Sequence, residues 1–201
     1  KLYIGGKIRA HTAINLNSAL VDDGQDIDLD WTGVLETVDG SISLNPGGLV
    51  AEIKGSIIAG GTTSDLTITA AHALTIYGKL QAGDDISVSA GNGNAVTAGA
   101  VSLRTEDTSE LRTLGATSEI LLTGRNDVQI NSHIGGLNPD LDLVQIASTN
   151  GSLIIEKAGG WVETGALIRL QGHNVEVAGV LRSTTATPAP DDYEVSIDID
   201  G

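Results

Sequence analysis

Short runs of alternating apolar and polar residues cover most of the chain. The clearest stretch is residues 66–85, LTITAAHALTIYGKLQAGDD. Leu66 and Ile68 are the apolar positions of one run, and Leu74 and Ile76 are those of the next. A period of two residues predicts β-strands with one buried face. The only plausible helical turn is LRTLGA at residues 111–116, and it contains a glycine. We therefore expect an all-β protein.

The same order of runs recurs along the chain. Residues 42–61, ISLNPGGLVAEIKGSIIAGG, repeat the pattern, with Ile53 matching Ile76 and Gly55 matching Gly78. A small residue, glycine or once serine, marks each repeat at positions 6, 33, 55, 78, 99, 132, 159 and 179. The repeat is roughly 20–27 residues with one longer step, which is typical of solenoids. In that longer step we interpret residues 104–117 as a polar insertion. In an earlier repeat, Trp31 matches Ile53 and Ile76 and is therefore expected in the core.

This repeat predicts a right-handed parallel β-helix in which residues 1–201 form a single segment of about eight rungs. One unit cannot bury its apolar face alone, whereas stacked units pair strand on strand and bury it continuously. Residues 184–192 are expected to form a Pro-rich loop. A β-sandwich is the alternative, but it requires several hairpin turns and Asn150-Gly151 is the main candidate. The residues expected to be buried in columns are Ile42, Leu44, Ile53, Leu66, Ile68, Ile76, Ile86, Val88, Ile130, Ile168, Leu170 and Val177.

Both ends of the sequence fall inside a repeat unit. The chain opens at Lys1-Leu2-Tyr3 without the first strand of a unit, and it ends on residues 195–199, VSIDI. We expect the chain to be an excerpt of a longer coil or to stack end to end. The termini should then lie at opposite ends of a rod.

The repeat pattern resembles the filamentous haemagglutinin-like repeats of large two-partner-secreted bacterial exoproteins and adhesins. The segments that carry the resemblance are residues 42–61, residues 66–85 and residues 168–183, IRLQGHNVEVAGVLRS. The resemblance implies a secreted protein at the bacterial cell surface, in which the β-helix is a stiff shaft. It also implies, as partners, other cells, extracellular matrix, surface glycans or further copies of the chain.

Composition and charge narrow the function further. Apolar residues make up 40% and aromatic residues only 2%, so the core must be aliphatic. Eleven Lys and Arg oppose 26 Asp and Glu, which gives a net charge of −15. Phosphate backbones and anionic membrane surfaces are repelled by such a chain, so we expect no nucleic-acid partner and no membrane insertion. The chain has no cysteine, and therefore no disulfide or thiolate chemistry.

The candidate chemistry is sparse. The four histidines, His11, His72, His133 and His173, occupy unlike places in the repeat, without the close spacing of a zinc site. Aspartates cluster at residues 22–30, 84–85, 140–142, 191–192 and 198–200, where calcium is a conceivable but unassigned ligand. Alternating aspartates as in IDLD and IDID are explained by solvation of an outer strand face. We assign no catalytic, cofactor-binding or metal-binding residues and expect no cofactor.

Two other functions remain open beside a rigid spacer. Many parallel β-helices act on polysaccharides with carboxylates, arginines and aromatic side chains on their outer faces. Arg104, Arg112 and Arg125 would serve such an enzyme if they converged. The third function is a self-assembling filament or sheath subunit. The expectation we favour is the non-enzymatic shaft.

Overall fold

The computed structural model describes residues 2–18, 27–93, 100–115, 117–135, 141–183 and 194–199. In this part of the chain every regular element is a β-strand, and the strands form three parallel sheets of eight strands each. Successive strands of the chain enter sheets A, B and C in turn, so three strands complete one coil. The predicted parallel β-helix is confirmed, and a sandwich of antiparallel sheets is excluded.

Each sheet takes one strand from each coil. Sheet A contains β1 (Leu2–Ile4), β4 (Ile27–Leu29), β7 (Val50–Ile53), β10 (Ala73–Ile76), β13 (Val101–Thr105), β16 (Asp127–Ile130), β19 (Ser152–Ile155) and β22 (Asn174–Val177). Sheet B contains β2 (Lys7–Ala10), β5 (Val34–Thr37), β8 (Ser56–Ala59), β11 (Lys79–Ala82), β14 (Glu110–Thr113), β17 (His133–Ile134), β20 (Trp161–Thr164) and β23 (Val180–Ser183). Sheet C contains β3 (Ile14–Asn17), β6 (Ile42–Asn45), β9 (Leu66–Ala70), β12 (Ile86–Ala90), β15 (Ser118–Gly124), β18 (Leu141–Ser148), β21 (Leu167–Gly172) and β24 (Glu194–Ile199). We number the coils 1 to 8 and name the corners A–B, B–C and C–A.

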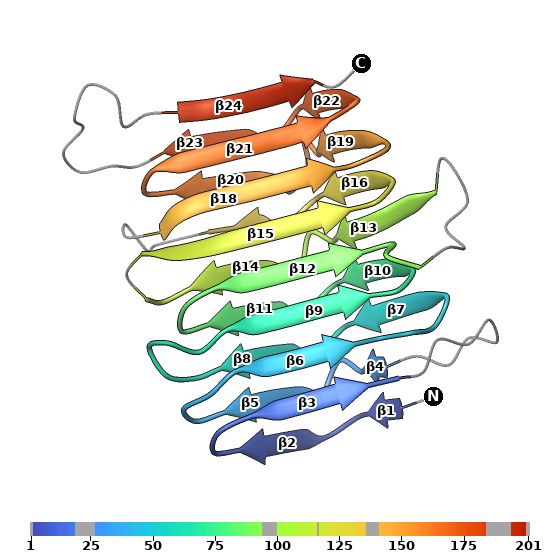
Figure 1. Cartoon of the computed structure of the whole chain (residues 1–201), viewed down its shortest axis with the longest axis vertical. Helices are drawn as coiled ribbons and strands as arrows, with labels where there is room; N and C mark the ends of the chain where they lie inside the picture. The colour runs from blue at the N-terminus through green and yellow to red at the C-terminus, as the bar shows by residue number, and fades with distance from the viewer. Residues whose placement is uncertain are drawn as a thin grey trace.

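The coil is right-handed. In Figure 1 the strands of sheet C run from left to right in front, while the chain climbs from β1 at the bottom to β24 at the top. Strands of neighbouring coils pair in parallel through all three sheets, as in the register Ile42 to Leu66 and Leu66 to Ile86. The first and last coils therefore lie at opposite ends of the stack, as expected.

The core is a set of aliphatic columns that run along the axis. Alternate residues of each strand point inward, so equivalent residues of successive coils stack on one another. Ile42, Leu66, Ile86 and Ile120 form one such column in sheet C, and all four are fully buried. Every residue of the predicted core list except Val177 is buried. Burial of each large aliphatic side chain contributes about 1.5–3 kcal/mol.

Two residues expected in the core are exposed. Leu29, and not Trp31, pairs with Ile53, so Trp31 lies two residues further along in the A–B corner and is 59% exposed. Val177 does stack on Ile155, as the repeat predicts. It is nevertheless 38% exposed, because it lies in coil 8 and no described residue covers its other side.

Small residues at the A–B corner let neighbouring coils approach closely. Gly33, Gly55 and Gly78 lie one above another, immediately before β5, β8 and β11. A Cβ on Gly78 would lie 1.7 Å from the carbonyl oxygen of Gly55, and one on Gly55 would lie 2.1 Å from that of Gly33. No larger side chain fits between coils at this spacing.

The register corrects two of the predicted marker positions. Glu110 pairs with Lys79 and with His133, so Ser109, and not Gly99, follows Gly78 in the column. Trp161 pairs with His133 and with Val180, which places Gly160, and not Gly159, in the column before Gly179. The other six of the eight predicted positions are confirmed. Each of the two errors occurs where a coil contains extra residues, and the sequence pattern alone does not show where those residues lie.

The segment expected as an insertion is part of the regular coil. Residues 104–105 end β13 and residues 110–113 form β14, which also replaces the predicted helical turn. The extra length of this coil lies instead at the C–A corner between β12 and β13, and in the turn at residues 106–109. The Pro-rich segment 184–192 lies outside the described residues.

Candidate functional surfaces

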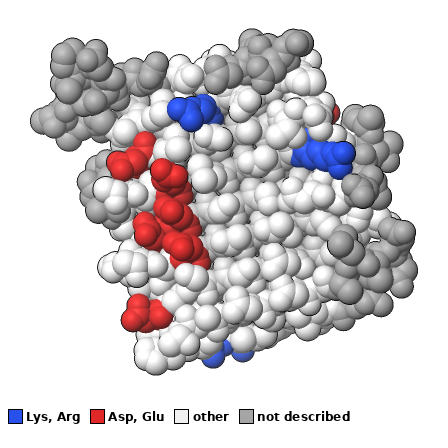
Figure 2. Space-filling model, in the orientation of Figure 1, with Lys and Arg blue, Asp and Glu red and all other residues white. Residues whose placement is uncertain are grey.

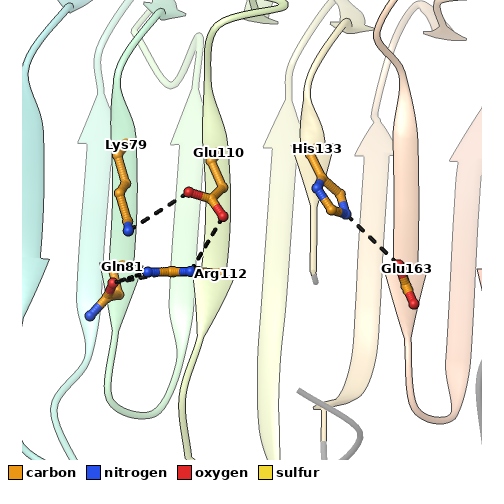
Figure 3. A network of polar contacts seen from close by, with 6 residues as sticks. All are labelled: Lys79, Gln81, Glu110, Arg112, His133 and Glu163. Carbon is orange, nitrogen blue, oxygen red and sulfur yellow. Dashed lines mark hydrogen bonds and ion pairs between the residues drawn. The ribbon is translucent and has the colours of Figure 1, made fainter. Parts of the chain in front are cut away.

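The outer face of sheet B carries a network of charged and amide side chains. Because outward residues also stack in columns, side chains from different coils meet there (Figure 3). Arg112 donates from Nε and Nη2 to Oε1 of Gln81, at 3.2 and 3.0 Å. Glu110 lies 3.5 Å from Arg112 and 3.7 Å from Lys79, so it bridges two coils. These partly exposed pairs hold neighbouring coils in register, with modest energy for each pair.

A second cluster on sheet B joins coils 6 to 8. The imidazole of His133 lies against the indole of Trp161, with ring centroids 5.6 Å apart. Glu163 lies 3.8 Å from His133 and 3.8 Å from Arg182 (Figure 3 shows the first pair). His133 Nε2 is buried and has no hydrogen-bond partner, because 3.8 Å is too long for a hydrogen bond. The cluster is a structural contact with one unsatisfied nitrogen.

The outer face of sheet C is mostly uncharged. Its outward columns consist of short hydroxyl and amide side chains in the lower coils, including Asn45, Thr67, Thr69, Ser87 and Ser89. Asn45 donates from Nδ2 to Oδ1 of Asn17 in the coil below. Figure 2 shows this face as largely white, with acidic side chains in a line along its left edge.

The B–C corner carries a ladder of acidic side chains. The Asp65 carboxylate accepts a hydrogen bond from the backbone N–H of Asp85, at 3.4 Å. The Asp85 carboxylate in turn accepts one from the N–H of Glu119, at 2.8 Å. Asp84 lies beside them, and burial together with the charges of Asp85 and Asp65 raises the pKa of its carboxyl group. The ladder ties coils together through backbone groups and concentrates negative charge.

One pocket lies where sheet C meets the C–A corner. It has a volume of about 300 Å³ and is lined by Ser18, Asn45, Thr69, Asn92 and neighbouring small residues. Ser18 accepts a hydrogen bond from the N–H of Gly47 at 2.7 Å, and Asn92 donates to Ser89 at 2.9 Å. The lining residues are uncharged and most of the surface that they present is apolar, so the pocket offers few hydrogen bonds.

The sequence-predicted candidates do not come together at one place. Arg104 is in sheet A and pairs with Glu106, Arg112 is in sheet B, and Arg125 lies at the C–A corner, where it donates to the carbonyl oxygen of Gly93. Contrary to expectation, two of the four histidines occupy the same place in the coil, because His72 and His173 each directly precede a strand of sheet A. His11 is at the B–C corner, His133 is in sheet B, and His72 and His173 are at the C–A corner in different coils.

The aspartate clusters are only partly visible. Asp22, Asp23, Asp26, Asp140, Asp191, Asp192 and Asp200 lie outside the described residues. Within the described ranges, no three His, Asp or Glu side chains are grouped as metal ligands would be. No helix long and apolar enough to cross a membrane occurs in the described ranges.

Sequence reasoning missed one surface feature, an exposed aromatic strip at the A–B corner of coils 1 to 4. The sequence contains one indication of this strip. Three residues lie between Leu29 and Gly33, two more than at the same corner of coils 3 and 4, and this extra length places Trp31 outside the core. No family model, curated protein or solved structure matches this chain.

Proposed function

We propose that this chain is a rigid shaft of a secreted or cell-surface bacterial protein, related in kind to the filamentous haemagglutinin-like adhesins. The observation that carries the proposal is the unbroken pairing of all three sheets around one aliphatic core. Each coil contacts its neighbours through three parallel ladders, so bending would break hydrogen bonds and open the core at once. Such a rod holds whatever it carries at a fixed distance.

The end coils support stacking on further coils of the same kind. Ile8 occupies the column of Leu35 and Ile57, and it is 40% exposed. At the other end Ile197 continues the column of Leu170 and is 47% exposed. Among the described residues none covers these core-column side chains. Exposed apolar columns and open strand edges favour association with a second copy of the same coil.

A whole-coil deletion tests the proposal in cells that produce the protein. Removal of residues 110–132, a segment without aromatic residues, joins Ser109 to His133, which takes the register position of Glu110. A shaft tolerates this loss, because every remaining strand still finds its equivalent neighbour. We expect the shortened protein to fold, to reach the cell surface and to keep its adhesion or display, measured with antibodies on intact cells. Removal of residues 110–121 is the matched control, and it should abolish folding because the coils fall out of register.

Two results would contradict the shaft. One is a whole-coil variant that folds, as judged by a cooperative melt, but loses all activity of the parent protein. The other is turnover of polysaccharides by the purified chain on a panel of pectin, alginate and neutral glucans, abolished by a single Asp→Asn change. The second result would favour a carbohydrate-active enzyme. Because the chain is strongly acidic, we expect neither binding nor cleavage of the acidic polymers.

A further inference from the structure

The A–B corner of coils 1 to 4 gathers aromatic side chains. The whole chain has two tryptophans and three tyrosines. Three of these five, Tyr3, Trp31 and Tyr77, lie on this corner or beside it. Tyr3 and Trp31 are each 59% exposed, whereas Ile4 and Leu29 near them in the chain are buried in the aliphatic core. Single exposed apolar residues are normal on a protein surface, whereas three of the five aromatic residues of the chain at one corner need an explanation.

A built turn projects Trp31 outward. Coil 2 has three residues, 30 to 32, between Leu29 and Gly33, where coils 3 and 4 have only Lys54 and Tyr77. The turn is closed by a hydrogen bond of 2.8 Å from the N–H of Gly33 to the carbonyl oxygen of Asp30. Thr32 fastens the turn to coil 1 by donating to the carbonyl oxygen of Gly5, at 2.9 Å. The backbone that carries Trp31 is therefore fixed.

The rings are also held in place. The Tyr3 hydroxyl donates to Oδ2 of Asp30 at 2.6 Å, and this bond raises the pKa of Tyr3 and lowers the pKa of Asp30. The Tyr3 ring lies over Gly5, where a Cβ would come within 2.9 Å of Tyr3 Cε1. The Trp31 and Tyr77 rings meet edge to face, with centroids 5.6 Å apart and an interplanar angle of 62°. Preorganised aromatic side chains bind with little loss of conformational entropy.

The geometry points to a binding strip for a neutral glycan chain, formed by Tyr3, Trp31 and Tyr77 and running parallel to the axis of the coil. The C–H face of a pyranose ring is apolar and carries slight positive charge, so it complements the negative face of an aromatic ring. Sugar hydroxyls, in turn, are good hydrogen-bond donors to carboxylates.

The neighbouring charges select the kind of glycan. Asp28, Asp30 and Glu52 lie around the strip, and Lys54 is paired with Glu52. Their net charge, like that of the whole chain, repels uronic acids, sulfated glycans and nucleic acids. A chain of uncharged sugars meets no such repulsion and can donate hydroxyls to the acidic rim.

The length of the strip suits an oligosaccharide. Tyr3 belongs to coil 1 and Tyr77 follows β10 of coil 4, so the strip spans three coil spacings. At about 4.8 Å each, this is roughly 14 Å, enough to contact more than one sugar ring. Several weak stacking contacts in a row give binding that a single exposed tryptophan would not.

The chain offers a clean test through its two tryptophans. Trp161→Phe leaves Trp31 as the only tryptophan, and its fluorescence can be titrated with cellopentaose, chitopentaose and mannopentaose. We expect a saturable spectral shift with at least one of these neutral probes and none with oligogalacturonate. Affinity measured by calorimetry should fall at least tenfold in Trp31→Ala and in Tyr77→Ala. It should be unchanged in Trp161→Phe, the matched control on another face.

Three outcomes overturn the inference. They are no response to any of the neutral probes, equal affinity in Trp31→Ala, and tighter binding of the anionic oligosaccharide than of the neutral ones. Thermal melts of each variant separate lost binding from lost folding, since Trp31 is in an exposed turn and its removal should leave the melting temperature nearly unchanged. The inference does not rest on the shaft proposal. A rigid coil that binds no glycan would still fold after the whole-coil deletion, so the two experiments can fail separately.

Discussion

Ile53 on β7 and Ile76 on β10 occupy the same position in successive coils, paired in register and both fully buried. Their side chains belong to one column that continues through Leu29 below. A gap in such a column cannot be filled by a neighbour in the same strand, because alternate residues point outward. The stack is therefore sensitive to loss of volume at any level.

Replacement of Ile76 by alanine tests this sensitivity. We expect Ile76→Ala to lower the free energy of unfolding by about 2–5 kcal/mol, measured by urea denaturation, because a cavity remains in the column. Val50 lies on the outer face of the same sheet and is 49% exposed, so Val50→Ala is the matched control with an effect below about 0.5 kcal/mol. Equal effects in the two variants would show that the inward and outward assignments are wrong.

The glycine column offers a sharper contrast. In Gly78→Ala the new methyl group would collide with the carbonyl oxygen of Gly55, so we expect a large fall in melting temperature or a failure to fold. Gly6 lies in the same column in coil 1, and a Cβ there meets nothing within 4 Å. Gly6→Ala should be neutral or slightly stabilising, since it restricts the unfolded chain. A neutral Gly78→Ala would refute the close approach of coils 3 and 4.

The acidic ladder predicts a pH effect. The raised pKa of Asp84 means that its charged form is disfavoured in the folded state. The ionised Asp84 carboxylate therefore lowers the free energy of unfolding at neutral pH. This destabilisation disappears as the pH falls through the raised pKa of Asp84. Asp84→Asn should raise the melting temperature at pH 7, and the gain should vanish below the ordinary aspartate pKa of about 3.9. The exposed Asp107→Asn is the control, and a gain that persists at low pH would argue against the assigned cause.

The unsatisfied nitrogen of His133 predicts a stabilising substitution. Phenylalanine keeps a ring against Trp161 and removes the buried Nε2 that lacks a partner. We expect His133→Phe to raise the melting temperature by about 2–4 °C, the equivalent of about 1 kcal/mol. His133→Ala loses the ring contact as well and should lower it. A fall in both variants would mean that the nitrogen has a partner in solution.

The architecture was predictable because burial repeats. Each coil must present aliphatic residues at the same places, so Ile53, Ile76 and their equivalents stand out in the sequence. Corner insertions have no such constraint. The two-residue surplus before Gly33 and the longer turn before Ser109 shifted the apparent repeat, which misplaced Trp31 and Gly99.

The surfaces were hardly predictable. Contacts such as Arg112 with Gln81 join residues from different coils, and they depend on which outward positions share a column. Once the register is known, these contacts follow directly. The aromatic strip likewise becomes visible only when residues 30 to 32 are placed in a corner and no longer in a strand.

A distance between two labelled positions shows directly whether the coil is continuous and rigid. The chain has no cysteine, so Arg9→Cys and Arg182→Cys on sheet B can carry two spin labels. These residues belong to the first and last strands of an eight-stranded sheet, separated by seven spacings. At about 4.8 Å each, a continuous rigid coil gives one narrow distance distribution centred near 34 Å, broadened only by the label linkers. A broad distribution, or a mean distance well below this value, would contradict a rigid shaft.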